Sequence, residues 1–429
     1  MKQPQEVDIA VLGAGAAGMA TALFLAENFS VKPAAGSPPT ICLLESAKKI
    51  GAKILVSGGG RCNLTHKIVT PNDFYGERNF IKKVLKALTV EKTVRWFSSL
   101  GIETKVEPTG KRFPVSNRAQ TVLSAFLEKL AEANIPIFRE HLVSAVNVVD
   151  EHFLVEHSSG SLRAKHLVLA TGGCSLPKSG SNGHGLKIAQ HLGHSVSDLL
   201  PALTPLVLQN SFGHGEIKGT SQEVSLSLFR DNKLQQRFSG PLLWTHFGVS
   251  GPVVLDISRH WNIAKQQDQT VRIEANFLPS YDDQKVTRWL TDSRTSGSSK
   301  FLKNILQEKL PKRFVALLLG RLGLPEDQRL AQLSKQKQKE LLLSLLHLEL
   351  PIVESRGWNV AEVTAGGVTL SEVNPTTMES KICPGLYFTG EILDVDGRLG
   401  GFNFQWAWST AKVAAEAITQ KWAASAKRG

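Results

Sequence analysis

The first residues of the chain change from a continuous apolar run to a helix-like spacing across a glycine turn. Residues 7–12 are largely apolar, residues 13–18 hold three glycines, and residues 19–26 are again mostly apolar. A second apolar run, residues 40–44, leads directly into Glu45. This order predicts a buried strand, a tight turn, a helix and a second buried strand.

The three glycines and the acidic residue follow the order of a dinucleotide-binding loop. Gly13 permits the turn, Gly15 lets a pyrophosphate approach the backbone, and Gly18 lets the helix pack closely on the strand. Glu45 can accept the hydroxyls of an adenosine ribose, although it follows Gly18 by 27 residues (45 − 18) rather than by about 20. The extra residues lie in loop 31–39, and loops accommodate insertions. The alternative is an ordinary buried strand with a glycine-rich turn.

The chain up to residue 193 continues with predicted helices and strands. A fully apolar strand that runs into small residues, as at 165–173, is typical of a buried parallel strand that ends at a ligand. The other expected elements are helical segments at 77–100 and 120–133, a hairpin at 102–115, and strands at 135–138, 142–149 and 153–157.

The pattern changes near residue 194 and changes back near residue 356. Short alternating runs separated by polar turns predict an inserted antiparallel β unit, and residues 302–350 have helical spacing. We therefore expect an α/β fold interrupted by a β-barrel-like unit and a small helical module. The expected parts are a first nucleotide-binding part at 1–193, the β unit at 194–280, the helical subdomain at 281–355 and a second nucleotide-binding part at 356–429.

Composition and charge are those of an ordinary globular chain with a basic excess. Of 429 residues, 42% are hydrophobic and the net charge is +12. Residues 281–350 hold 13 Lys/Arg against 8 Asp/Glu, which could attract nucleic acid or an acidic partner. The charges are mixed in sign and no aromatic stacking pattern accompanies them, so a solvated basic face is the favoured interpretation.

The compartment is inferred from the cysteines and the apolar segments. The four cysteines lie far apart without a C-x-x-C pair, which fits a reducing compartment and offers no zinc site. No segment has the uninterrupted apolar length of a membrane span. We expect a cytoplasmic protein without a metal centre.

A second glycine-rich segment follows Glu45. The three consecutive glycines at 58–60 cannot form a stable helix or strand interior. Their backbone carries no side chains, which indicates that a ligand approaches it closely. Lys53 and Arg61 flank these glycines, which points to an anionic ligand. Cys62 is interpreted either as a redox-active thiol or, preferably, as a small packed residue.

Residues 57–63, with the sequence SGGGRCN, resemble the corresponding segment of the BaiN/YhiN-like family of NAD(P)/FAD-dependent oxidoreductases. The resemblance extends to the FGVSGP loop at 247–252 and covers essentially the whole chain. It departs from the family where residues 183–185 read GHG rather than GDG, and where 409–411 lack a glycine. His184 is accordingly interpreted as a residue that flanks a helix or, less favoured, as a titrating group near the active site.

The resemblance implies a Rossmann-like FAD-binding domain of the glutathione-reductase type. In such flavoproteins a strand followed by Gly-acid, here Gly390-Glu391, holds the ribityl chain, and the next helix N-terminus points at the isoalloxazine ring. A backbone contact to adenine is expected near Val143. Together, the loops and the resemblance give these expected cofactor-binding residues: Gly13, Gly15, Ala16, Ala17, Gly18, Glu45, Ser46, Lys53, Gly59, Gly60, Arg61, Cys62, Asn63, Val143, Thr171, Gly172, Gly390, Glu391, Gly400, Gly401, Phe402, Asn403 and Phe404.

Three functions are compatible with this pattern. The first is an FAD-dependent oxidoreductase, linked to NAD(P)H, that acts on a small organic substrate, for example by reducing a C=C bond of a cyclic compound. The second is a flavin enzyme of RNA modification, and the third is a non-enzymatic flavin sensor. No catalytic residue is assigned, because Arg61, His246 and Asn403 cannot be ranked as proton donors without geometry.

Overall fold

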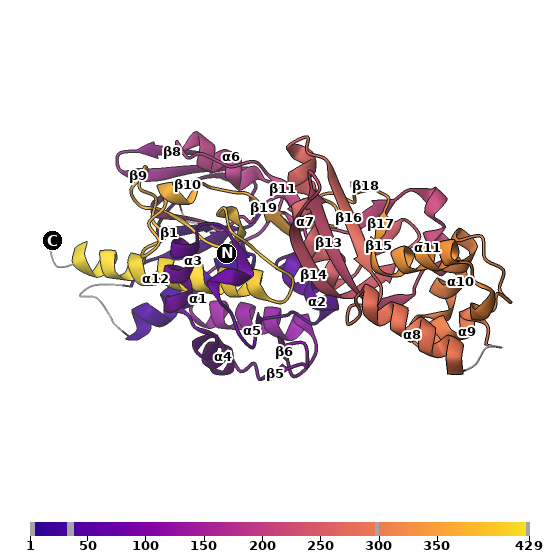
Figure 1. Ribbon diagram of the computed structural model, residues 1–429. Helices are drawn as coiled ribbons and strands as arrows, with labels where there is room; N and C mark the ends of the chain where they lie inside the picture. Colours follow the sequence, from indigo (N-terminus) through magenta and orange to yellow (C-terminus); the bar gives the residue numbers. More distant parts are fainter. Residues whose placement is uncertain (1–4, 32–37, 297–299, 426–429) are drawn as a thin grey trace. The chain divides into compact units, whose positions relative to one another are not determined.

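The computed structural model describes residues 5–31, 38–296 and 300–425. The chain forms two compact units, one made of Met1–Leu199 with Val363–Gly429 and the other of Leu200–Glu362 (Figure 1). The boundaries therefore lie several residues later than the expected ones at 193/194 and 355/356. The reason is pairing, because Val196 bridges Val368 within the first unit, whereas the Arg356 N–H donates to the Pro205 carbonyl within the second.

The first unit is built on a sheet whose strands run in the order β7-β2-β1-β10-β9-β8, with β20 also paired to β10. Strands β7, β2, β1, β10 and β20 pair parallel with one another, whereas β9 pairs antiparallel with both β10 and β8. Leu12 lies opposite both Leu44 and Leu169, so three strands end at the same edge. The bounds are β1 (Glu6–Leu12), β2 (Ile41–Leu44), β7 (Ile137–Phe138), β8 (Val143–Val149), β9 (His152–His157), β10 (Gly160–Leu169) and β20 (Leu386–Phe388).

Helices of the first unit pack around this sheet, and α1 lies beside α12 (Figure 1). The segment 77–100, expected as one helix, is two helices because Thr89 caps the second, its hydroxyl accepting from the Lys92 N–H. Aromatic side chains fill the core, where Trp408 contacts Phe97 edge to face. The helices are α1 (Ala16–Val31), α2 (Ala52–Gly60), α3 (Arg78–Ala87), α4 (Val90–Ser99), α5 (Ala119–Glu132), α6 (His184–His191) and α12 (Phe402–Ser425).

Two small sheets complete the first unit. The hairpin expected at 102–115 is present as β5 (Thr104–Val106) and β6 (Lys111–Pro114), and β3 (Thr65–His66) adds to it. Strand β4 (Phe74–Tyr75) pairs with β21 (Asp396–Gly397). These short pairings hold the segment after the second glycine loop against the start of α12. Two further short strands, β11 (Leu200–Ala202) and β19 (Val363–Ala365), flank the boundaries of the units.

The second unit contains a seven-stranded sheet in the order β17-β16-β13-β14-β15-β12-β18. Its two edge strands, β17 (Leu348–Leu350) and β18 (Ile352–Ser355), are consecutive in the chain, so the edges come together at Pro351. The sheet therefore curls back on itself. The remaining strands are β12 (Leu206–Leu208), β13 (Ser221–Arg230), β14 (Lys233–Trp244), β15 (Gly248–Ser250) and β16 (Val271–Asn276).

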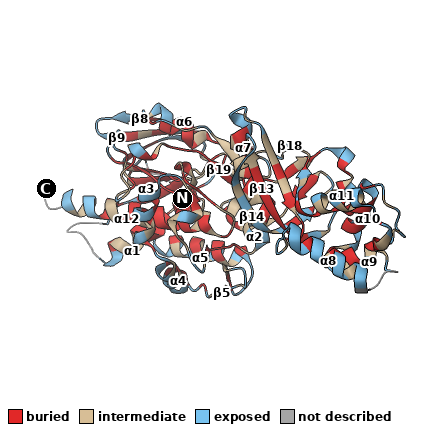
Figure 2. Cartoon of the chain, viewed as in Figure 1, coloured by how far each residue is buried: buried red, intermediate tan, exposed pale blue. Residues whose placement is uncertain are grey.

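The strands and helices of the second unit share one hydrophobic core, which Figure 2 shows as buried ribbon in both. Trp244 of β14 stacks with Phe314 of α10 at 5.9 Å between ring centroids. The β part and the helical part are thus one compact unit rather than two separate modules divided near residue 280. The helices are α7 (Pro252–Gln266), α8 (Asp283–Ser296), α9 (Leu302–Gln307), α10 (Lys312–Arg321) and α11 (Lys335–Leu346).

Candidate cofactor site of the first unit

The first glycine loop has the geometry that its spacing predicts. Gly13 has a φ of +100°, and a Cβ there would lie 2.6 Å from the Ala170 carbonyl oxygen. A Cβ on Gly18 would lie 1.9 Å from the Gly13 carbonyl oxygen, so only glycine fits at either position. At Gly15, by contrast, a Cβ would meet no atom within 4 Å. Open space therefore lies at the start of α1, whose first residues are Ala16 and Ala17, where helix amides attract an anion.

Glu45 lies beside this loop at the end of β2. Its Oε2 accepts from the Ala14 N–H at 2.8 Å, and its Oε1 accepts from the Ala47 N–H at 2.8 Å. The Ser46 hydroxyl donates to the same carboxylate at 3.4 Å. The acid is thus fixed next to the glycine turn, despite its unusual distance along the chain. Most of the loop that adds this distance, residues 32–37, lies outside the described residues.

The second glycine segment leaves the helical conformation where three glycines follow one another. In α2, Ser57 has a ψ of 146°, and Gly58 and Gly59 have positive φ. A Cβ on Gly58 would lie 2.9 Å from the Phe113 ring, whereas one on Gly59 would meet nothing within 4 Å. At Gly60 the nearest atom would be 3.8 Å away. The backbone of Gly59 and Gly60 is exposed and bare, which fits a flat ligand close to it.

Arg61 is paired with an acidic residue, and Cys62 is buried. The Arg61 guanidinium forms an ion pair with Glu107 at 2.6 Å and lies 4.0 Å from the centre of the Phe113 ring. Cys62 is fully buried with a φ of +61°. Burial raises the pKa of the Cys62 thiol to about 12, although a hydrogen bond with Ser57 acts in the opposite direction. The thiol is therefore protonated at neutral pH, as expected of a packed residue.

Asn63 provides an observation that points to a ligand. Its Oδ1 is buried and accepts no hydrogen bond from the described residues. A buried acceptor without a donor is costly unless a ligand or water satisfies it. A Cβ on Gly401 would lie 2.8 Å from this oxygen, so the two segments meet there. The Asn63 Oδ1 thus has unused hydrogen-bonding capacity where these two segments meet.

Lys53 and Glu391, which are 338 residues apart, form a tight pair. Lys53 Nζ lies 2.8 Å from Glu391 Oε2 and donates to Ser175 Oγ at 2.6 Å. Glu391 Oε1 accepts from the Thr364 N–H and from the Ser175 hydroxyl. Burial acts to raise the pKa of Glu391, but Lys53 and these hydrogen bonds hold it below its usual value. The anion that Lys53 meets in the structure is therefore Glu391.

The turn after β10 approaches α6 closely. A Cβ on Gly185 would lie 1.8 Å from Thr171 Oγ1, and that hydroxyl is buried without a partner among the described residues. Gly172 has a φ of +73°. The Val143 carbonyl lies 2.5 Å from His184 Nε2, so this carbonyl is already engaged. His184 begins α6, which agrees with the favoured interpretation of a residue that flanks a helix.

The start of α12 brings the C-terminal glycines to the second glycine segment. Gly400 and Gly401 have positive φ, and a Cβ on Gly401 would lie 2.7 Å from the Thr65 carbonyl oxygen. The Phe402 ring stacks on His66 with 5.0 Å between centroids. His66 was missed by sequence reasoning, although it follows the SGGGRCN segment by three residues. Phe404 stacks on Trp408 within the same helix.

Asn403 and Gly390 are held by local hydrogen bonds. Asn403 accepts from the Gly397 N–H at 2.8 Å and donates to the Gly397 carbonyl at 2.9 Å. Both ends of its carboxamide are thus used to fix the preceding turn, and the candidate role of proton donor is not supported by this geometry. The Gly390 N–H donates to Thr410 Oγ1, so the polar residue in place of a family glycine is accommodated.

The expected cofactor-binding residues all belong to the first unit. They lie at the ends of β1, β2, β10 and β20, at the starts of α1 and α12, within and directly after α2, and, for Val143, at the start of β8. His246, the remaining candidate proton donor, belongs to the second unit and is exposed. Among the described residues, no group of three or more His, Cys, Asp and Glu side chains could hold a metal ion. Within the same residues, no helix combines the length and apolar character needed to cross a membrane.

Comparison with known families decides the classification. The family described as "HI0933-like protein Rossmann domain" matches residues 7–417. The chain belongs to this HI0933-like family. Membership confirms the resemblance of residues 57–63 to the BaiN/YhiN-type proteins and makes the chain a flavoprotein oxidoreductase.

Relatives with curated names match over nearly their whole length. A 3-dehydro-bile acid delta(4,6)-reductase of Clostridium scindens is 30% identical over 96% of this chain and 99% of the relative. A ribosomal RNA dihydrouridine synthase of Escherichia coli is 33% identical over 96% of this chain and 98% of the relative. A protein of the same name from Haemophilus influenzae has the same identity and coverage.

Solved structures share the fold at low sequence identity. A variant FrdA subunit of E. coli quinol–fumarate reductase has a TM-score of 0.52 and 17% identity, over 100% of this chain and 72% of that one. The 3-ketosteroid-delta4-(5alpha)-dehydrogenase of Rhodococcus jostii RHA1 has a TM-score of 0.50 and 14% identity, over 98% of both chains. These similarities support a Rossmann-type α/β fold for the HI0933-like chain and nothing finer.

Proposed function

We propose that this protein is an FAD-dependent reductase of a carbon–carbon double bond conjugated to a carbonyl group. The substrate would be a small cyclic compound, and NAD(P)H would supply the hydride. The names of the three relatives support this chemistry, because a delta(4,6)-reductase and a dihydrouridine synthase both add hydrogen across a ring double bond. Overall, the double bond gains a hydride and a proton, and NAD(P)H is oxidised to NAD(P)⁺.

The FAD assignment is supported by two glycine backbones that face open space and by a buried hydrogen-bond acceptor that has no donor in the described part of the chain. Gly15 and Gly59 each face open space, and Asn63 Oδ1 lacks a donor among the described residues. We assign the pyrophosphate to the first loop, near Gly15 and the start of α1, and the ribose to Glu45. Asn63 would accept a hydrogen bond from the flavin. FAD, once bound, supplies the ring that takes up and passes on the hydride.

The C-terminal segment would complete this site in the manner of the glutathione-reductase type. Helix α12 begins at Phe402 and runs for 24 residues, so its N-terminus carries a partial positive charge. Directed at the flavin, this end would stabilise negative charge on the reduced ring. Gly390-Glu391 would approach the ribityl chain, with Glu391 kept ionised by Lys53.

The test begins with the visible spectrum of the purified protein and its anaerobic titration with NADH and then NADPH. We expect a flavin spectrum that is bleached by one nucleotide and restored by a 3-oxo-Δ4 steroid, used as a conjugated-enone probe, with formation of the saturated ketone. Failure to bind FAD on reconstitution would overturn the proposal as a whole. A bound flavin that neither nucleotide reduces would remove NAD(P)H and leave a substrate-reduced enzyme or a sensor.

A second candidate function, the reduction of uridine in RNA, is favoured by two observations. Two relatives that are 33% identical are named ribosomal RNA dihydrouridine synthases. In addition, residues 281–350 carry 13 Lys/Arg against 8 Asp/Glu. The enone probe and a uridine-containing RNA should therefore be offered to the reduced protein in parallel. Dihydrouridine in the RNA, detected by mass spectrometry, without reduction of the enone would favour the second function.

A further inference from the structure

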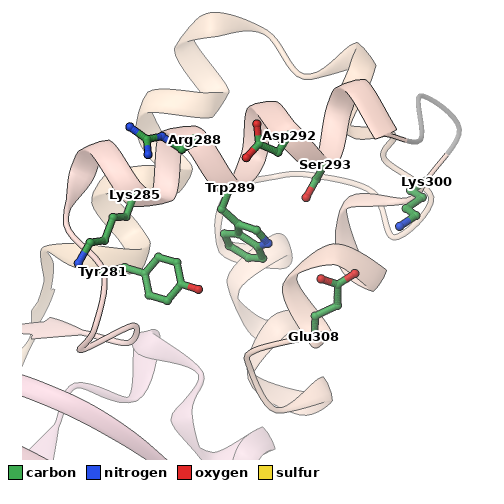
Figure 3. Close-up of a pocket in the computed structure, with 8 residues that line it drawn as sticks. All are labelled: Tyr281, Lys285, Arg288, Trp289, Asp292, Ser293, Lys300 and Glu308. Carbon is green, nitrogen blue, oxygen red and sulfur yellow. The ribbon is translucent and has the colours of Figure 1, made fainter.

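Two adjoining cavities lie beside α8 in the second unit. The first, of about 410 Å³, is lined by residues of α8 and by Tyr281, Lys300 and Glu308, as Figure 3 shows. The second, of about 570 Å³, shares Tyr281 and Glu308 with the first and extends toward the start of β13. In Figure 3 the Trp289 side chain points from α8 into the hollow, whereas Arg288 points outward. The hollow thus combines an aromatic floor with a charged rim.

The aromatic floor consists of two rings under one cation. The centroids of Tyr281 and Trp289 are 6.3 Å apart. Lys309 Nζ lies 4.9 Å from the Tyr281 centroid and 5.4 Å from the Trp289 centroid. Both rings are partly exposed, and Lys309 is exposed. No sequence pattern indicates this grouping, because Lys309 follows Trp289 by 20 residues (309 − 289) and lies beyond the end of α9.

Cations predominate around the floor. Lys285, Arg288 and Lys300 line the first cavity, together with two carboxylates, Asp292 and Glu308. The second unit as a whole holds 21 Lys/Arg against 16 Asp/Glu, and residues 281–350 hold 13 of the former and 8 of the latter. The rest of this unit is therefore balanced at 8 against 8. Its whole positive excess lies in the segment that forms the cavities.

We propose that this aromatic and basic surface, made of Tyr281, Lys285, Arg288, Trp289 and Lys309, binds single-stranded RNA. The partly exposed rings provide a stacking surface for an unpaired base, and the cations would contact the phosphates on either side. An acidic peptide would satisfy the cations but leave the rings unused. The inference rests on the second candidate function, uridine reduction in RNA, and deepens it by naming a surface of the second unit that would hold the RNA. Binding is measured without flavin chemistry, so loss of RNA binding and loss of reductase activity are distinguishable outcomes.

The experiment measures binding of a short, fluorescein-labelled single-stranded RNA to the flavin-loaded full chain by fluorescence anisotropy at several salt concentrations. We expect Trp289→Ala to weaken binding about five- to a hundredfold through loss of stacking. Lys309→Glu should weaken binding and lower the slope of log Kd against log salt by about one or more. Both variants should keep the flavin spectrum and the reductase half-reaction of the unmodified protein.

The matched control is Lys265→Glu. Lys265 is also exposed and also lies over a tryptophan of the second unit, with Nζ 5.7 Å from the Trp261 centroid, but it is outside the proposed surface. It should leave RNA binding nearly unchanged. Equal losses for Lys265→Glu and Lys309→Glu would show a general charge effect and overturn the proposal. If polyglutamate displaced the RNA and Trp289→Ala had no effect on RNA binding, the proposal would also be overturned, and an acidic protein partner would be favoured instead.

Discussion

Replacing Gly15 by valine is the most direct perturbation of the first glycine loop. A Cβ at this position would meet no atom within 4 Å, and Gly15 does not have the positive φ that its neighbour Gly13 has. The valine side chain is therefore compatible with the fold of the protein without cofactor. It would instead occupy the open space at the start of α1, where the pyrophosphate is proposed to lie. We expect Gly15→Val to fold but not to retain FAD.

The size of the effect follows from the contacts that the pyrophosphate would lose. Hydrogen bonds to a charged group contribute about 1.5 to 3 kcal/mol each. Losing two of them at the helix start would cost about 3 to 6 kcal/mol, which corresponds to a loss of affinity of at least about a hundredfold. In the same loop, a Cβ on Gly18 would lie 1.9 Å from a backbone oxygen. Gly18→Val should therefore damage the fold itself.

The assay compares the ratio of flavin to protein absorbance after purification and the Kd for FAD measured with the flavin-free protein. Thermal unfolding of the flavin-free protein reports the fold. Gly215→Val in the second unit is the matched control, because a Cβ on Gly215 would also meet no atom within 4 Å and this glycine has no positive φ. Normal flavin content in Gly15→Val would refute the placement of the pyrophosphate. Loss of folding in Gly15→Val would refute the claim that the space is open.

Three other outcomes are expected. Lys53→Met should lower the free energy of unfolding by about 3 kcal/mol, because Glu391 would keep a largely buried charge without its partner. Urea unfolding measures this change. The double variant Lys53→Met/Glu391→Gln should lose less free energy of unfolding than the two single variants lose in sum. Cys62 should resist alkylation by iodoacetamide at pH 8 in the folded protein, since burial raises its pKa to about 12; peptide mass spectrometry after unfolding gives the comparison, and rapid labelling would contradict the buried thiol. The free energy of unfolding should fall as the pH falls from 6.5 to 4, because burial lowers the pKa values of His166 and His260 to about 4, whereas in the unfolded chain they are near 6.5, so the unfolded chain binds more protons. Each histidine contributes about 2 kcal/mol of this loss at pH 5. Thermal unfolding over a pH series checks this, and a His166→Phe variant with the same pH dependence as the unmodified protein would contradict the contribution of His166.

Local geometry explains which parts of the site were predictable from the sequence. At Gly13 and Gly18 only glycine fits, because a side chain would clash with atoms a few residues away or in the adjacent strand. A short sequence motif is therefore enough to predict these positions. The bare backbone at Gly59 likewise follows from consecutive glycines. The helix break at Thr89 was in principle visible as a capping residue, but the apolar spacing ran across it without interruption. The spacing of apolar residues alone does not mark the end of a helix when it continues without interruption into the next helix.

Long-range pairing was not predictable in the same way. Nothing near Lys53 in the sequence identifies Glu391 as its partner, and a cation beside glycines suggests a phosphate equally well. The predicted division near residue 280 took no account of contacts of this kind, because stacking of Trp244 on Phe314 joins a strand and a helix with different periodicities. The boundaries at 199 and 362 depend on backbone bridges that no pattern of apolar residues records.

The ion pair of Lys53 and Glu391 reduces the contribution that the charge of Lys53 can make to binding an anionic cofactor. A lysine left free beside the glycines would add a full positive charge to the anion-binding surface. Paired at 2.8 Å, it is neutralised, so the attraction for a pyrophosphate must come from backbone amides and from the partial charge at the start of α1. Binding that depends on fixed dipoles rather than on a mobile cation is sensitive to small changes in backbone position. For that reason a side chain at Gly15, which removes no charge, is expected to affect FAD binding more than the loss of Lys53.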